Sequence, residues 1–129
     1  MGKRYLIDSN VIIDYTALRL PEKGSDFVEN LFDNDFLISV ATKIEVLGFN
    51  DVAEKLLALE EFVNSATTLS LDELVTNKTI VLRREYKKLK LGDAIIAATA
   101  LAHDLIVISR NIADFKNING LQVIDPYNL

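Results

Sequence analysis

The chain has 129 residues, of which 50% are hydrophobic and 26% are charged, a composition that indicates one folded domain and excludes a disordered tail. It has no cysteine and one histidine, which excludes disulfides, a thiol nucleophile, thiolate zinc sites and histidine-rich metal sites. The net charge of −5 argues against a general nucleic-acid binder, and the lack of a long apolar run predicts a cytoplasmic protein without a membrane span.

The first forty residues alternate between apolar runs and helical patterns. A strand is predicted over residues 3–8, ending in Asp8, and a helix follows because apolar residues recur at helical spacing as far as Leu18. A break before a second helix is predicted by three turn-forming residues, Pro21, Gly24 and Ser25. That second helix carries an apolar stripe made of Phe27, Val28, Leu31 and Phe32. Residues 36–40 are predicted to form the next strand.

The middle of the chain is predicted to hold two helices and another strand. A short helix is expected from about Thr42 to Gly48, and a longer one begins at Asn50 or Asp51. The longer helix is indicated by apolar residues at helical intervals, namely Val52, Leu56, Leu59 and Val63. Residues 65–69 are rich in Thr and are predicted to form a strand, so the alternation of strand and helix continues.

The last part of the chain is predicted to begin with an amphipathic helix over residues 71–89. Its core-facing residues are Leu71, Leu74, Val75, Leu82 and Leu89. A helix from Asp93 to Ala102 has almost no polar face, so it should be central and covered on most sides. Strands are expected at 105–109 and 121–124, around a turn at 111–115. This alternation predicts an α/β fold: one domain over residues 1–129, a three-layer α/β/α sandwich with a central parallel sheet.

Four acidic residues follow strands or begin helices in this scheme. Asp8 ends the first strand, Glu45 lies one turn into the helix after the second, and Asp93 opens the central helix. Asp114 lies in the turn after the strand at 105–109. In open α/β sheets these ends of the elements meet at one edge, where ligands bind. The four carboxylates are therefore predicted to lie at the same edge of the sheet.

Carboxylates gathered without a counter-charge repel one another, and some would bind protons instead of remaining ionised. A divalent cation resolves the repulsion. A ligand set made only of oxygen atoms is the preference of Mg²⁺ or Mn²⁺, which keep several waters and complete their coordination with substrate phosphates. Phosphodiester hydrolysis is the reaction class that such a site predicts.

Each acid taken alone also has a purely structural interpretation. Thr42 and Glu45 have the spacing of a capping box, and so do Ser70 and Glu73, for which no chemistry is predicted, so spacing alone does not separate the two glutamates. Asp93 would be favoured by the dipole of its helix, and Asp114 would be an ordinary turn residue. Asp8 would cap the following helix, although an acid at the end of a buried strand is costly unless something binds it. His103 is interpreted as a favourable residue at a helix C-terminus.

Four segments resemble PIN-domain proteins, specifically the VapC-type toxin ribonucleases of toxin–antitoxin pairs. The four segments are LIDSNVI at 6–12, ISVATKIEVLG at 38–48, LGDAIIAATA at 91–100 and SRNIADF at 109–115. They occur in the family's order and at its distances, over nearly the whole chain. The last segment begins with Ser109 where the family usually has Thr, a mild change because the hydroxyl is retained.

The resemblance implies an Mg²⁺- or Mn²⁺-dependent endoribonuclease in which water attacks phosphorus in line and leaves 5′-phosphate and 3′-hydroxyl ends. It implies Asp8 and Asp93 as the best direct metal ligands, with Glu45 holding a second ion or the attacking water. Asp114 would orient ligands or bind metal weakly. Three further residues are candidates for fixing the carboxylates in place, namely Asn10, Ser109 and Asn111.

The resemblance also implies partners, namely an RNA substrate, a second copy of the chain in a homodimer, and an antitoxin that wraps the toxin and covers its acidic site. Apolar residues on the first two helices either serve this purpose or belong to the core, namely Tyr15, Leu18, Leu20 and Phe32. A local phosphate track is a further hypothesis, and it would consist of Arg83, Arg84, Lys87, Lys88 and Arg110. Otherwise these cations form a solvated surface.

Three other functions fit the sequence less well. A phosphatase of the haloacid dehalogenase type would need an acid where the chain has Asn10, and a receiver domain would need paired acids after the first strand. The stronger alternative is a catalytically inactive PIN domain that acts as an RNA-binding or protein-interaction module. The presence of all four acids favours the enzyme.

Overall fold

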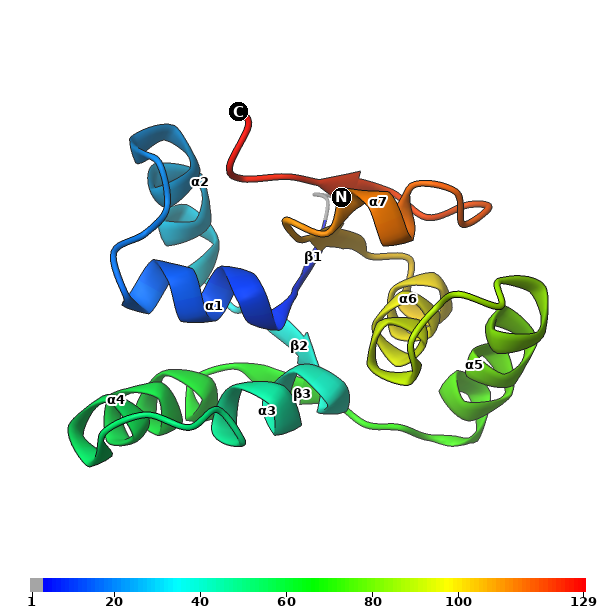
Figure 1. Cartoon of the computed structure of the whole chain (residues 1–129), viewed down its shortest axis with the longest axis horizontal. Helices are drawn as coiled ribbons and strands as arrows, with labels where there is room; N and C mark the ends of the chain where they lie inside the picture. Colours follow the sequence, from blue (N-terminus) through cyan, green and yellow to red (C-terminus); the bar gives the residue numbers. More distant parts are fainter. Residues whose placement is uncertain (1–3) are drawn as a thin grey trace.

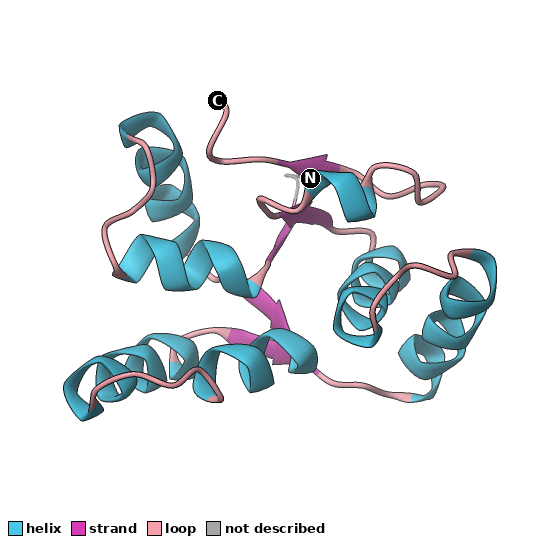
Figure 2. Ribbon diagram, in the orientation of Figure 1, coloured by secondary structure: helices cyan, strands magenta, loops and turns pink. Residues whose placement is uncertain are grey.

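Five short parallel strands form the middle layer of the structure, a computed structural model that describes residues 4–129 (Figure 2). The strand order is β3-β2-β1-β4-β5, and every neighbouring pair is parallel. The strands are β1 (Tyr5–Ile7), β2 (Leu37–Ser39), β3 (Thr67–Leu69), β4 (Ile106–Ile108) and β5 (Val123–Ile124). All five lie within the predicted runs, although Lys3 of the first run is outside the described residues.

Helices cover both faces of this sheet, which confirms the predicted α/β/α sandwich (Figure 1). One face is covered by α1 (Ser9–Thr16), α2 (Glu22–Phe32) and α4 (Ala53–Asn64). The other face is covered by α5 (Glu73–Glu85) and α6 (Leu91–His103). The remaining helices are α3 (Val40–Leu47), which contributes to both core clusters, and the single-turn α7 (Ile112–Phe115). No helix within residues 4–129 is both long and apolar enough to cross a membrane.

Alternation of side chains along the strands divides the core into two clusters. Leu6 and Val107 point to the side of α5 and α6, whereas Ile7 and Ile108 point to the side of α1 and α2, and all four are fully buried. Strands that are apolar on both faces are typical of a parallel sheet between two layers of helices. The predicted central helix is α6, in which six residues from Ala94 to Ala100 are buried. The rigid sheet that results fixes the positions of the residues that follow its strands.

The first helix is shorter than predicted, because it ends at Thr16. Leu18 was expected on its apolar stripe, but this side chain is 90% exposed and its φ of 58° is in the left-handed region, which ends a helix. The Thr16 hydroxyl donates hydrogen bonds to the carbonyls of Ile12 and Ile13 in the last turn of the helix. The prediction for Leu18 is therefore wrong, and it lies outside the core.

Gly24 and Ser25 were predicted to precede the second helix, but both lie inside α2. The reason is close packing, because a Cβ atom on Gly24 would lie 1.8 Å from the carbonyl oxygen of Pro126. Glycine therefore lets α2 approach the C-terminal segment, and only Pro21 marks the break. Gly24, interpreted from the sequence as a turn signal, is therefore needed for a contact with a residue far away in the sequence.

The amphipathic helix predicted over 71–89 is also shorter, because α5 starts after Asp72, whose side chain accepts a hydrogen bond from the Val75 N–H at 2.9 Å. Leu71 and Leu74, predicted to face the core, are 44% and 54% exposed. Leu89 is buried as predicted but lies beyond the helix. The predicted turn at 111–115 contains the helical turn α7.

Candidate active site

Asp8 lies directly after β1 and is nearly buried, with 3% of its surface exposed. Its Oδ1 accepts a hydrogen bond from the Ser9 N–H at 2.8 Å, so the residue caps α1. Its Oδ2 accepts one from the Ser109 hydroxyl at 2.6 Å and one from the Asn10 amide at 3.2 Å. The capping and site interpretations of Asp8 are thus compatible, since each uses a different oxygen.

The register of the sheet brings Ser109 to Asp8. Ile7 pairs with Ile108, so the next residue of each strand lies at the same carboxyl edge. Ser109 is completely buried, and its Oγ also accepts a hydrogen bond from the Asn111 N–H at 2.9 Å. The Arg110 N–H donates to Asn10 Oδ1 at 3.2 Å, which fixes the orientation of that amide. The three residues expected to orient carboxylates therefore form one network around Asp8.

Burial raises the pKa of the Asp8 carboxyl, while the hydrogen bonds from Ser109, Ser9 and Asn10 lower it by a smaller amount. The donors around Asp8 are neutral hydroxyl, amide and backbone groups. They stabilise the ionised carboxylate without supplying a positive charge. The site therefore holds a buried acid whose charge is incompletely compensated by its neighbours.

Glu45 does not belong to a capping box, the structural interpretation considered for it from the sequence, because α3 is capped by Ser39. Ser39 caps this helix by accepting from the Thr42 N–H at 3.1 Å, so Thr42 lies inside the helix and the predicted capping box is wrong. A Cβ atom on Gly92 would lie 3.6 Å from Glu45 Oε1, which places the carboxylate against the start of α6. The comparison segment at Ser70 has no capping box either, because Asp72 is the cap.

Asp93 lies in the first turn of α6 and is half-buried. Its pKa is raised to about 6, first by burial and then by the negative charges of Asp8 and Asp114, while Lys90 opposes the shift. The pKa of Glu45 is likewise raised, first by burial and then by the charges of Asp8 and Asp93. The structure thus brings the four acids close enough for their charges to act on one another.

Asp114 is the most peripheral of the four acids. It lies on α7 and is exposed, and its carboxylate accepts a hydrogen bond from the Asn111 side chain at 2.7 Å. This contact agrees with the ordinary turn role considered from the sequence. The negative charge of Asp114 nevertheless helps to raise the pKa of Asp93. Asp114 therefore stands at the rim of the site.

The donor chemistry of this edge fits a hard divalent cation, because the available ligands are carboxylate oxygens, and neighbouring negative charges add to the burial that raises the pKa values of Glu45 and Asp93. Among residues 4–129, no three acidic or histidine side chains converge closely enough to hold an ion as they stand.

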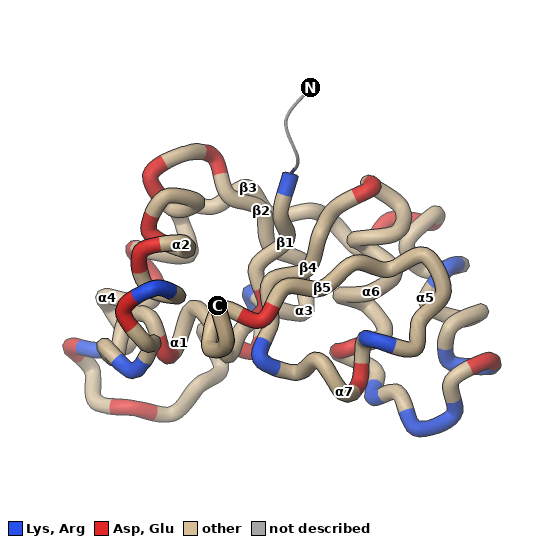
Figure 3. Tube along the Cα trace, turned by 90° about the horizontal axis from the view of Figure 1, so that it is seen from above, with Lys and Arg blue, Asp and Glu red and all other residues tan. Residues whose placement is uncertain are grey.

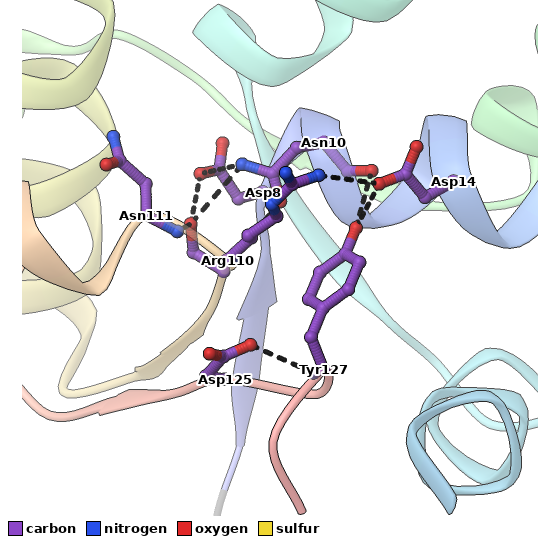
Figure 4. A network of polar contacts seen from close by, with 8 residues as sticks. Asp8, Asn10, Asp14, Arg110, Asn111, Asp125 and Tyr127 are labelled. Carbon is purple, nitrogen blue, oxygen red and sulfur yellow. Dashed lines mark hydrogen bonds and ion pairs between the residues drawn. The ribbon is translucent and has the colours of Figure 1, made fainter. Parts of the chain in front are cut away.

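A second network, which the sequence analysis missed, holds the outer side of Asn10. The Tyr127 hydroxyl donates to Asp14 and lies 3.4 Å from the carbonyl oxygen of Asn10 (Figure 4). Arg110 Nη1 lies 3.7 Å from Asp14 Oδ2, and its guanidinium is 5.2 Å from the centre of the Tyr127 ring. Burial and the Asp14 carboxylate raise the Tyr127 pKa, so the phenol remains protonated. The only sequence signal was that Asp14 lies four residues after Asn10, on the same helix face.

Comparison with known proteins adds an independent line of support. The model of the PIN domain family matches residues 5–121. Ribonuclease VapC1 of Rickettsia felis is 27% identical over 129 aligned residues, which cover 92% of this chain and 93% of that protein. These matches run through all of the segments that carry the four acids.

Solved structures also match along nearly the whole chain. A chain of a toxin–antitoxin complex from Klebsiella pneumoniae is 30% identical, with a TM-score of 0.78 and coverage of 97% of this chain and 99% of that chain. A chain of DNA-bound VapBC from Salmonella typhimurium has a TM-score of 0.81 at the same coverage, and its 23% identity shows the shared fold.

Proposed function

The chain belongs to the PIN-domain family, and on this basis we propose that it is a divalent-metal-dependent endoribonuclease, the VapC-type toxin of a toxin–antitoxin pair. The observation that carries the proposal is the gathering of Asp8, Glu45 and Asp93 at one sheet edge, where each carboxyl has a raised pKa. Burial raises all three pKa values and neighbouring negative charges add to this at Glu45 and Asp93, so a bound cation would stabilise the ionised carboxylates. The family match supports RNA as the substrate of that cation site.

Asp8 and Asp93 would hold Mg²⁺ or Mn²⁺ directly, with Glu45 and Asp114 completing or orienting the set. A bound divalent ion supplies a Lewis acid for the phosphoryl group and lowers the pKa of water, so that water becomes a nucleophile. The protein's own contribution is to keep the carboxylates ionised and correctly placed. Ser109 and Asn10 do this for Asp8 Oδ2 through their hydrogen bonds.

Purified protein incubated with a panel of defined RNAs, with Mn²⁺ or with EDTA, tests the proposal. We expect metal-dependent cleavage that Glu45→Gln reduces strongly. Glu73→Gln is the matched control, because Glu73 has the same sequence spacing but lies away from the four acids, in the first turn of α5. Equal loss in both variants, or cleavage that persists in EDTA, would contradict the proposed acidic centre.

The proposal includes an RNA substrate in the cytoplasm, a homodimer and an antitoxin that covers the acidic edge. The toxin–antitoxin complexes among the similar structures support the antitoxin. Of the apolar residues considered for these contacts, Tyr15, Leu20 and Phe32 pack against the core, whereas Leu18 is exposed. Light scattering of the isolated chain tests the dimer. Loss of RNA cleavage on co-expression with a candidate antitoxin tests the partner.

A further inference from the structure

Positive charge is concentrated in one stretch of this acidic chain. Residues 76–90 contain six basic residues and one acid, and the basic residues are Lys78, Arg83, Arg84, Lys87, Lys88 and Lys90. Figure 3 shows these positions around α5 and the segment that follows it, whereas acidic positions dominate around α2. The chain therefore has a local basic surface despite its net charge of −5.

The structure separates the cations of this surface by what they contact. Arg83 Nη1 donates to the Leu89 carbonyl at 2.9 Å, so it holds the turn after α5 in place. Arg110 is paired with Asp14 and lies over Tyr127. Both arginines therefore have structural partners. Lys87 and Lys88 instead line a cavity of about 300 Å³.

This cavity lies between the turn after α5 and the helical turn α7. Its walls are Tyr86, Lys87, Lys88 and Leu89 on one side and Ala113, Asp114 and Asn117 on the other. The Tyr86 hydroxyl accepts a hydrogen bond from the Asn119 N–H at 3.1 Å, which ties the two walls together. Since Asp114 forms part of one wall and its charge acts on Asp93, the cavity adjoins the acidic edge.

We propose that this cavity, called here the lysine groove, binds the RNA strand beside the cleaved bond, with Lys87 and Lys88 contacting backbone phosphates. The inference rests on the proposed ribonuclease function and states on which side of the acidic edge the RNA strand binds. Four carboxylates repel an incoming polyanion, so attraction has to come from cations nearby. A volume at the lower end of the range for small-ligand sites suits one nucleotide.

RNA binding in EDTA, measured by fluorescence anisotropy at several salt concentrations, tests the lysine groove without requiring cleavage. The test variant is Lys87→Ala/Lys88→Ala. Loss of two phosphate contacts should lower the slope of log K against log salt by about 1.4, which is an affinity loss of about 25-fold at 0.1 M relative to 1 M salt. In Mn²⁺, KM should rise with little change in kcat, because the lysines do not touch the reacting atoms.

The matched control is Lys23→Ala/Lys55→Ala, which removes the same two charges from α2 and α4 on the other face of the sheet. Lys87→Arg/Lys88→Arg should restore the salt slope, since both substitutions keep the charge. If the wild type cleaves RNA while the alanine variant and the control have equal slopes, the lysine groove is wrong and the ribonuclease proposal stands. If the wild type neither binds nor cleaves RNA, both proposals are overturned.

Discussion

Asp8, at the carboxyl end of β1, lies in very different surroundings from Glu45 on α3 and Asp93 on α6. At the strand ends, Asp8 is 3% exposed and is held by hydrogen bonds from Ser9, Asn10 and Ser109. On the helices, Glu45 and Asp93 have pKa values raised by burial and by neighbouring negative charges. Asp8 is held by neutral donors, whereas Glu45 and Asp93 lie beside other negative charges.

This difference indicates that one part of the site is organised before a ligand binds and that another part responds to the ligand. Backbone register sets the distance between Asp8 and Ser109, so the strand ends are organised before any ligand arrives. Glu45 and Asp93 lie beside other negative charges, which Lys90 partly offsets at Asp93, so their positions should respond most when a cation binds. The predictions below test whether the strand ends act as the rigid half of the site and the helices as its responsive half.

Asp8→Asn should have the largest effect. The shape of the side chain and an oxygen that can accept from the Ser9 N–H are retained, but the charge at the centre of the rigid half is lost, and an amide nitrogen in place of Oδ2 accepts no hydrogen bond from Ser109 or Asn10. RNA cleavage should fall by more than about 100-fold, since groups that merely orient metal ligands already contribute about 10- to 100-fold. Thermal unfolding should show a melting temperature close to that of the wild type, because removal of a buried charge offsets the loss of the hydrogen bonds to Oδ2. Retained cleavage would show that the rigid half is not part of the catalytic centre.

Ser109→Ala should reduce cleavage less, by about 10- to 100-fold, because it removes one orienting hydrogen bond and leaves the carboxylate in place. Ser109→Thr is the matched comparison, since it keeps the hydroxyl that donates to Asp8 Oδ2. It should retain most of the activity. Steady-state kinetics at saturating Mn²⁺ would distinguish the two variants, and equal rates for alanine and threonine would argue against a positioning role.

The same contrast explains what the sequence could predict. The strand ends were predictable, because apolar runs locate parallel strands and the residues that follow them must meet at one edge. Asp8 and Ser109 needed only this rule and the family resemblance. The environment of Glu45 was not predictable, since the choice between Ser39 and Thr42 as the helix cap depends on where β2 ends.

Contacts between residues far apart in the sequence account for other features that could not be predicted from the sequence. The Gly24 contact with Pro126 and the Tyr127 contact with Asp14 each join residues more than 100 positions apart, and no local pattern marks them. Helix ends were also misplaced where a local cap overrode the apolar periodicity, as at Asp72. The periodicity of α5 continued through Leu71, which is exposed because the helix has not yet begun.

Tyr127→Phe tests how far the rigid half extends. The hydroxyl that joins Asp14 to the Asn10 carbonyl is lost, while the ring under Arg110 remains. We expect the free energy of unfolding to fall by about 1.5 to 3 kcal/mol, as for loss of a hydrogen bond to a charged group, with cleavage reduced a few-fold. Tyr15→Phe, on the same helix as Asp14 but packed among Phe32 and Phe62, is the control. A few-fold loss of cleavage in Tyr15→Phe as well would indicate general destabilisation.

The smallest expected effect is a pH dependence of folding stability caused by Asp93, in the responsive half of the site, in the metal-free protein. The folded-state pKa of Asp93 is about 6, above the usual value of 3.8, so the folded protein binds a proton more tightly than the unfolded chain. The corresponding stability is present below pH 4 and is lost as the pH rises through 6. Because Asp93 is partly exposed, solvent screening should limit the loss to about 1 kcal/mol.

Urea unfolding in EDTA at pH 5 and pH 8 measures this loss, and Asp93→Asn isolates it from the raised pKa values of Asp8 and Glu45. The wild type should lose more stability between the two pH values than the variant does. Adding Mn²⁺ at pH 8 should restore stability to the wild type and much less to the variant, because the cation replaces the missing proton as a counter-charge. If the two proteins have the same pH dependence and the same response to Mn²⁺, Asp93 is not part of a repulsive acidic centre, and the contrast between a rigid and a responsive half fails.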